Sequence, residues 1–466
     1  MFANIFAQSA FQNLPNLPKN FVAPQCVLLK DELLICGGEN NNKCYSYHLV
    51  KKQYEYICSY PSGVELKGHC VLQLSHQGDN PDEIHLYPLE DKMQANIWSH
   101  TQKAEPSLNS WTLVAKSQIG ELSDNLEGVR GVIGGMNNDL LFITHFPKNI
   151  RVIDLKTMKP LKGVTNSIIP NKENESEHCF VPLTMNGSVT KVVNHFLLFH
   201  RNIGLLISFD EGQRTFTYEN LPTCPELREV SSYAFLGCYG YVFLFGGCDN
   251  RSKAKTRCVW KYSISRKIWS VCKSKLPTEV SSSFALLDQN NVHVHVIGGV
   301  VTKEVQDYHW TISADQLFQT HELMQIVQDQ EQDIRSLKEK IASLELSRPY
   351  VIPETMEEKE VEQSIDKKVE PPKEWRDIQQ QMKEIGNSLI SLEKLSTMDW
   401  AQSNCTGLEL WGCNGKAHLV NQKLLTCMED IVTITTDLSP LGTIIDVGDL
   451  YAFFFCFFSS KILISL

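Results

Sequence analysis

A short C-terminal stretch of the chain carries side chains of the types that bind zinc. Cys405, Cys413, His418 and Cys427 lie in it and offer thiolate and imidazole ligands. The gaps between these residues lack the short Cys-x-x-Cys and His-x-x-x-His pairs from which zinc sites are commonly built. We therefore expect no zinc at this cluster.

Two histidines form a second candidate for chemistry. His293 and His295 alternate along a predicted β-strand, so their side chains face the same side of it. A metal site needs further ligands, and the sequence places no third one beside them. We interpret both residues as polar positions near the middle of the fold that are satisfied by hydrogen bonds.

Sequence motifs of two common enzyme classes are absent. The chain contains no GxxxxGKS or GxxxxGKT phosphate-binding loop and no GxSxG nucleophile turn. The sequence therefore indicates no catalytic residue, no metal and no cofactor, and we expect a protein that is not an enzyme.

The composition is that of a globular protein with an acidic surface. The chain has 466 residues, more than the roughly 250 to 300 residues that one core usually serves, so we expect a compact domain with an extension. Apolar residues make up 42% and charged residues 21%, which is enough to bury a core. The formal net charge of -10, with no basic run, argues against a nucleic-acid partner.

The N-terminus and the cysteines point to a reducing compartment. The opening sequence MFANIFAQSAFQ lacks both the basic region and the continuous apolar run of a secretion signal. The 15 cysteines are odd in number, and several lie inside apolar strand-like runs, as Cys36 and Cys238 do. We expect reduced, buried thiols and a cytoplasmic location.

Short apolar runs closed by two glycines recur along the chain. DELLICGG ends at Gly37 and Gly38, and GYVFLFGG and VHVHVIGG have the same form. Glycine allows the backbone conformations that side chains with a Cβ disfavour, as a tight turn after an inner strand requires. The two later pairs are Gly246 with Gly247 and Gly298 with Gly299.

Aromatic residues seven positions apart follow these runs. We expect them to pack between neighbouring β-sheets, where large rings bury the most area. A degenerate copy without the glycines keeps the aromatic spacing. The three pairs are Tyr47 with Tyr54, Phe209 with Phe216, and Tyr262 with Trp269.

The copies repeat with a period of about 52 residues, close to the roughly 50 typical of kelch repeats. Second strands are expected to end near residues 37, 88, 145, 200, 246 and 298. In its diglycines and spaced aromatics the chain resembles the kelch-repeat family over about two thirds of its length. The resemblance implies an all-β fold, a six-bladed kelch-type β-propeller over residues 1–313. A β-sandwich whose hairpin turns carry the glycines is the alternative.

The last repeat lacks a fourth strand after Tyr308. Phe11, followed by Leu14-Pro15 and Leu17-Pro18, looks like an unpaired fourth strand and its exit turn. We predict that this N-terminal segment completes the last blade and covers two exposed sheet edges. An unpaired N-terminal tail is the alternative.

Residues 314–347 change from strand to heptad spacing, and the pattern predicts a coiled-coil helix. Val or Ile at one core position with Leu at the other favours two parallel strands, so we expect a homodimer. A helix folded back on the propeller is the alternative. The predicted seam consists of Leu323, Val327, Ile334, Leu337, Ile341 and Leu344.

The rest of the chain divides by composition. Residues 348–372 are charged and contain proline, as a solvated linker does. Residues 373–396 form a second predicted amphipathic helix, and 397–466 are a tail of uncertain structure. The final LYAFFFCFFSSKILISL is apolar, but Lys461 leaves it short of the roughly 20 residues that a membrane span needs. We expect no membrane association, with a membrane-anchored adaptor as the alternative.

The resemblance also implies a function. Many kelch proteins bind other proteins through the loop-rich face of the propeller, as adaptors or scaffolds. We expect a non-catalytic scaffold that binds an unidentified protein partner and gains strength from its dimeric form. The alternative is an enzyme of the galactose-oxidase type, whose copper is held by tyrosines and histidines that we cannot match to positions here.

Overall fold

A computed structural model gives the structure of the chain. It describes residues 10–29, 31–39, 41–61, 66, 68–74, 83–89, 94–101, 110–118, 125–146, 149–170, 178–184, 191–302 and 304–346. The chain divides into two compact units, Met1–Thr320 and His321–Leu466, and each unit is described by itself.

The first unit is built from antiparallel sheets of four strands. In chain order, the first sheet contains β2 (Cys26–Leu29), β3 (Glu32–Gly38), β4 (Asn41–His48) and β5 (Gln53–Ser59). The second contains β6 (Cys70–Leu74), β7 (Glu83–Leu89), β8 (Gln94–Thr101) and β9 (Ser110–Gln118). The third contains β10 (Asn125–Gly134), β11 (Leu140–Phe146), β12 (Asn149–Asp154) and β13 (Lys159–Pro160).

Three more sheets of the same kind follow in the chain. The fourth sheet contains β14 (Cys179–Thr184), β15 (Lys191–His200), β16 (Ile203–Asp210) and β17 (Thr215–Asn220). The fifth contains β19 (Ala234–Cys238), β20 (Tyr241–Phe245), β22 (Val259–Ser263) and β23 (Ile268–Val271). The last contains β24 (Phe284–Leu287), β25 (His293–Ile297), β28 (His309–Ser313) and β1 (Gln12–Asn13).

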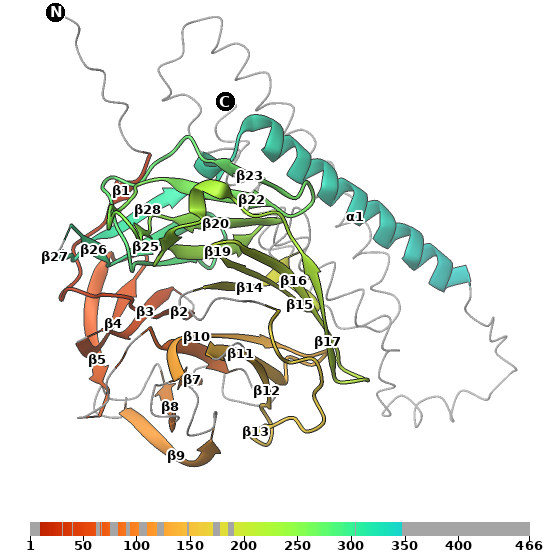
Figure 1. The fold of residues 1–466 in the computed structure, drawn as a ribbon, viewed down its shortest axis with the longest axis horizontal. Coiled ribbons are helices and arrows are strands. Elements are labelled where there is room, and N and C mark those ends of the chain that lie inside the picture. The colour runs from red at the N-terminus through yellow and green to blue at the C-terminus, as the bar shows by residue number, and fades with distance from the viewer. Residues whose placement is uncertain are drawn as a thin grey trace, which may run out of the picture. The chain divides into compact units, whose positions relative to one another are not determined.

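The sheets are arranged as an all-β propeller. Each first strand contacts the first strand of the next sheet, in the order β2, β6, β10, β14, β19 and β24. In Figure 1, β2, β10, β14 and β19 lie near the centre, and the fourth strands β5, β9, β13 and β17 lie at the outside. The expected all-β propeller is confirmed. Five sheets are described with most of their side chains, whereas the sheet of β6 to β9 is described mainly by its strand pairing.

The core lies between neighbouring sheets, because each sheet buries apolar side chains on both faces. One cluster joins Phe142 of β11 to Phe196 of β15, and another joins Phe199 of β15 to Val242 of β20. A further cluster joins Tyr47 of the first sheet to residues of the last, so these two sheets also pack together. Packing of this kind gives each sheet two neighbours.

The last sheet contains strands from both ends of the first unit. Gln12 pairs with Thr311 and Asn13 with Trp310, so β1 is the outer strand beside β28. The Leu14 amide donates a hydrogen bond of 2.9 Å to the carbonyl of His309. Phe11 and Leu17 on either side of β1 are buried. The N-terminal segment is thus part of the sheet that ends the propeller.

The glycine pairs sit where one sheet approaches the next. Gly246 and Gly247 have φ of +65° and +113°, and the Gly247 amide donates a 2.8 Å hydrogen bond to the carbonyl of Val280. A Cβ at Gly246 would collide with this same carbonyl oxygen. Val280 leads into β24 of the following sheet. The glycines therefore allow main chain to lie against main chain between blades.

The aromatic residues seven apart are direct cross-strand partners in the hairpin of third and fourth strands. Their ring centroids lie 4.7, 4.7 and 5.1 Å apart in the three pairs. The first ring of each pair also contacts a ring of the preceding sheet. The cross-strand pairs are Tyr47 with Tyr54, Phe209 with Phe216, and Tyr262 with Trp269, and the contacts are Tyr47 with His309, Phe209 with Phe142, and Tyr262 with Phe199.

The propeller strands are followed by a 3-10 turn, Ala314–Leu317, and by the helix α1, Thr320–Leu346. Among the predicted seam residues, Leu323 is half-buried and Val327 is buried. The side chains of Ile334, Leu337, Ile341 and Leu344 lie outside the described residues, so the coiled coil and the homodimer stay predictions. In the described part of the chain no helix is long and apolar enough to cross a membrane.

The predictions for the linker 348–372, the helix 373–396 and the tail 397–466 also fall outside the described residues. So does the Cys/His cluster of Cys405, Cys413, His418 and Cys427. Within the residues that are described, no three His, Cys, Asp or Glu side chains are grouped as a metal site would require.

Candidate functional site

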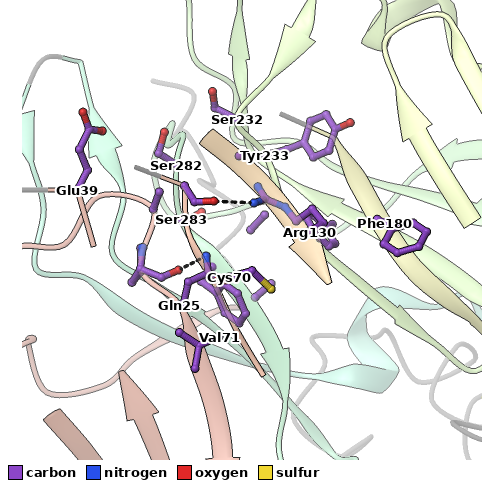
Figure 2. Close-up of a pocket in the computed structure, with 18 of the residues that line it drawn as sticks. Gln25, Glu39, Cys70, Val71, Arg130, Phe180, Ser232, Tyr233, Ser282 and Ser283 are labelled. Atoms are coloured by element: carbon purple, nitrogen blue, oxygen red, sulfur yellow. Dashed lines mark hydrogen bonds between the residues drawn. The ribbon is translucent and has the colours of Figure 1, made fainter. Parts of the chain in front are cut away.

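A cavity of about 280 Å³ lies where the first strands begin, at one end of the propeller axis. All six sheets contribute to its wall, because residues that begin or lead into β2, β6, β10, β19 and β24 line it together with Phe180 of β14. Figure 2 shows the labelled side chains around it. The site is therefore a product of the ring as a whole.

The wall of this cavity contains a chain of backbone hydrogen bonds. The Ala23 amide donates to the carbonyl of Ser282, and the Ser282 amide donates to the carbonyl of Ser232, both over 2.7 Å. All three residues are left-handed, with φ of 46°, 56° and 55°. The cavity is thus framed by main chain that is held in place, an arrangement that needs little reorganisation to bind a ligand.

Two glycines continue this frame on the side of the second and third sheets. Gly68 and Gly128 have φ of 59° and 69°, and both line the cavity. A Cβ placed on Gly68 would lie 3.0 Å from the Cα of Gly128. The segment before β6 and strand β10 could not approach so closely with larger residues at these positions.

Arg130 of β10 is the cation of the cavity wall, and its position is fixed. Its Nη1 donates hydrogen bonds of 3.2 Å to the carbonyl of Gly68 and 2.9 Å to that of Val129. The guanidinium carbon lies 5.5 Å from the ring centroid of Phe235 of β19, a distance at which a cation is attracted to the ring face. Figure 2 shows the bond from Arg130 to a backbone oxygen.

The other edge of this guanidinium is open. Within the described residues, neither Nε nor Nη2 of Arg130 has a hydrogen-bond acceptor, and no carboxylate pairs with the side chain. The Nε and Nη2 edge presents two parallel N–H groups that match the two oxygens of a carboxylate. The side chain is half-buried, so its charge is less screened than that of a surface arginine.

The charge of Arg130 acts on groups in the neighbouring sheets. Burial raises the pKa of the Cys70 and Cys179 thiols, and Arg130 opposes this rise at both. The pKa of His69 is lowered to about 4, mainly because the side chain is buried. The hydrogen bond to the carbonyl of Cys36 raises this pKa, and the charge of Arg130 lowers it. The three groups lie on or next to β6 and β14, so the charge of Arg130 acts on both sheets that contact its own.

Polar groups complete the wall. Ser283 is 8% exposed, and its Oγ has no hydrogen-bond partner among the described residues. Gln25 is also buried, and its Nε2 donates 3.0 Å to the carbonyl of Pro24. Glu39, which is exposed, adds one acidic side chain to the lining. A buried hydroxyl without a partner carries a cost that a bound polar group or a water can remove.

Two small two-stranded sheets lie next to the cavity wall. β18 (Val230–Ser231) pairs with β21 (Cys248–Asp249), and β26 (Val300–Val301) pairs with β27 (Glu304–Val305). Ser231 of β18 directly precedes Ser232 of the cavity wall. Ser281, which forms a β-bridge with Val300 of β26, directly precedes Ser282 of the wall. The loops after the second strands of the fifth and last sheets therefore border the cavity.

The residues singled out from the sequence lie elsewhere. Nδ1 of His293 lies 3.3 Å from a carboxylate oxygen of Asp288, and Nδ1 of His295 lies 2.9 Å from Nε2 of His309. Neither histidine lines the cavity, and the glycine and aromatic signature residues do not line it either. The site residue that sequence reasoning missed is Arg130. Its signal is a lone arginine between glycines, in GVRGV, within an apolar inner strand.

Comparison with known proteins does not identify a family for this chain. No protein-family model matches the chain, and the comparison with curated proteins found no match. Among solved structures, YjhT matches with a TM-score of 0.45 and 11% identity over 64% of this chain and 95% of that one. A structural genomics protein of unknown function from Bacteroides thetaiotaomicron matches with a TM-score of 0.40 and 10% identity over 65% and 73%. The assignment as a β-propeller rests on the strand pairing described above.

Proposed function

We propose that this chain is a non-catalytic protein-binding module that docks a partner protein on the face where the cavity opens. The observation that carries the proposal is the cavity itself, a fixed frame of main chain around an arginine whose open edge lacks a partner among the described residues. The two-stranded sheets β18–β21 and β26–β27 enlarge the surface around it. Concave sites with a few convergent polar groups are where proteins bind ligands.

The finer assignments belong to the same proposal. The propeller is of the kelch type and has six blades, with the sheet of β6 to β9 as the second. Support for this comes from the glycine pairs and cross-strand aromatics, which recur at the blade spacing of about 50 residues. Residues 314–347 dimerise as a coiled coil, and the dimer works as a cytoplasmic scaffold or adaptor that gains affinity through its two linked sites.

Proximity labelling in the native cell tests this function. The rim variants Glu39→Trp and Lys253→Trp place bulk on the cavity face, and Arg266→Trp places the same bulk on the β22–β23 turn. That turn lies at the opposite end of the sheet, because Tyr241 pairs with Ser263 there and Phe245 pairs with Val259 near the cavity.

We expect one set of proteins to be labelled by the wild type and by Arg266→Trp, and to be lost with either rim variant. Equal thermal unfolding of the variants would show that the fold is intact. A labelled set that depends on Arg266 and not on the rim would place the binding surface on the other face and refute the proposal.

A further inference from the structure

The size of the cavity limits what can enter it. A volume of about 280 Å³ is at or below the low end of the roughly 300 to 1,000 Å³ typical of small-molecule pockets. It accommodates one side chain of a partner with a few waters. The group that occupies it is therefore better supplied by a protruding residue of a docked protein than by a large free ligand.

The charge of the lining selects an anion with one negative charge. Arg130, which is half-buried, is the only cation among the residues that line the cavity, and the only carboxylate there, that of Glu39, is exposed to the screening of solvent. A carboxylate matches the open Nε and Nη2 edge of Arg130 in both geometry and charge. A phosphate group, with close to two charges near neutral pH, would leave part of its charge uncompensated in a half-buried site.

Ser283 provides a second, independent sign that a polar group is accommodated. Its Oγ is buried in the cavity wall without a partner among the described residues. A hydroxyl can donate to a carboxylate oxygen that also accepts from Arg130. A bound carboxylate would satisfy the hydroxyl and the guanidinium together.

The basic loop 250–257 extends this preference outside the cavity. It follows β21, which pairs with β18 next to Ser232 of the wall. Lys253 and Arg257 are exposed and form no ion pair among the described residues, whereas Arg251 pairs with Glu229 over 2.6 Å. Unpaired cations beside a binding site attract acidic residues and increase the rate of association.

The Lys255 side chain holds this loop against the neighbouring hairpin. Its Nζ donates 2.8 Å to the carbonyl of Val300 and 2.9 Å to that of Thr302. The loop is thus anchored between the fifth and last sheets, next to Ser281 and Ser282. Its free cations are held at the rim by this anchor.

We propose that the partner docks through an acidic segment, with one Asp or Glu carboxylate bound to Arg130 and Ser283 and further acidic residues over the loop 250–257. This inference rests on the proposed function and names the chemistry of the partner at that face. It requires no covalent step and no cofactor.

Selection of short random peptides on the full-length protein tests the inference. We expect the selected peptides to share an acidic residue at one fixed position. A synthetic copy with that Glu or Asp replaced by Gln or Asn should bind about tenfold to a hundredfold more weakly, the loss expected when one partner of a desolvated charge pair is removed.

Variants of the protein locate the contact. Arg130→Gln should weaken binding of the acidic peptide to the level of the amide peptide, whereas Arg266→Gln, the same change on the β22–β23 turn, should leave it unchanged. The double variant Lys253→Gln with Arg257→Gln should slow association and flatten its dependence on salt, relative to Lys159→Gln with Arg266→Gln as the matched control. Ser283→Ala should weaken binding less than Arg130→Gln does.

Three results would overturn the inference. These are selection without a shared acidic residue, selection of no peptide at all, and acidic peptides whose affinity is indifferent to Arg130. In each case, loss of the proximity-labelled proteins with the rim variants would still support docking on this face. If both rim variants instead labelled the same proteins as the wild type, the proposed function itself would be contradicted. Unchanged thermal unfolding of Arg130→Gln would show that its effect is local.

Discussion

Nδ1 of His295 lies 2.9 Å from Nε2 of His309, and both side chains are buried between strands β25 and β28 of the last sheet. His309 also places its Nδ1 2.6 Å from the hydroxyl of Tyr54, which belongs to the first sheet. The Tyr54 hydroxyl in turn donates 3.1 Å to the carbonyl of Pro15. This polar network therefore joins the first and last sheets at the place where the ring closes.

The network predicts that the propeller loses stability in mild acid. Burial lowers the pKa of His295 to about 4, with Asp288 opposing and His293 adding to the shift, and it lowers the pKa of His309 well below its usual range. Because the pKa of each histidine is lower in the folded chain than in the unfolded chain, the unfolded chain binds more protons between these two pKa values. Stability is then complete above about pH 6.5, the unfolded value, and falls as the pH approaches 4.

Thermal or urea unfolding measured at several pH values checks this. Each neutral buried histidine contributes a slope of up to about 1.4 kcal/mol per pH unit in that window. His295→Gln removes one of these groups and should give a shallower slope than the wild type. A variant of a half-buried histidine outside this network, His48→Gln, serves as the control, and equal slopes in all three proteins would contradict the role of the pair.

A Cβ at Gly246 should destabilise the junction of two sheets. Gly246→Ala combines an unfavourable φ with a collision against the Val280 carbonyl, and we expect a loss of about 2 to 4 kcal/mol in the free energy of unfolding. Gly212→Ala is the control, because its residue is exposed, has no positive φ and would meet only the side chain of Asp210 at 3.4 Å. Equal urea midpoints of the two variants would argue against the close approach.

The ring pair of Phe209 and Phe216 should be a major source of stability. Both are buried, and both contact Phe142 of the preceding sheet. Phe216→Ala should cost about 3 to 5 kcal/mol, the usual loss for a buried phenylalanine. Thr217→Ala on the other face of the same strand should cost less than about 0.5 kcal/mol, as exposed substitutions do. A small effect of Phe216→Ala on chemical unfolding would show that the sheets are not held by these rings.

Removing the N-terminal strand should open the ring at its last sheet. Deletion of residues 1–18 takes away β1 and the buried Phe11 and Leu17, each worth roughly 1.5 to 3 kcal/mol of burial. We expect a lower unfolding temperature and a stronger tendency to associate, because the edge of β28 becomes unpaired. Deletion of residues 1–9 is the control. Calorimetry and light scattering distinguish the outcomes, and equal behaviour of the two deletions would refute the structural role of β1.

The repeat could be predicted from the sequence because its signals are local. A glycine pair after an apolar run, and aromatics seven apart, are properties of one hairpin and its neighbour. The second strands end at Gly38, Leu89, Phe146, His200, Phe245 and Ile297, next to the positions expected from the repeat.

The cavity could not be predicted in the same way. Arg130, Ser283 and Ala23 come from three sheets and meet only when the ring is assembled, so no spacing in the sequence reveals them. The network of Tyr54, His309 and His295 was missed for the same reason. The expectation of hydrogen-bonded histidines rested on the lack of a third ligand, and it gave no indication of the partners that the fold supplies.

Main-chain hydrogen bonds of Ala23, Ser232 and Ser282, and not their side chains, hold the wall at the opening of the cavity. Because amides and carbonyls set the aperture, the side chains at these three positions can be exchanged without altering its diameter, provided that the new residue accepts a left-handed backbone. Asparagine and aspartate meet that condition most readily. Substitutions at these positions would therefore change the chemistry at the mouth of the cavity while keeping the same main-chain frame.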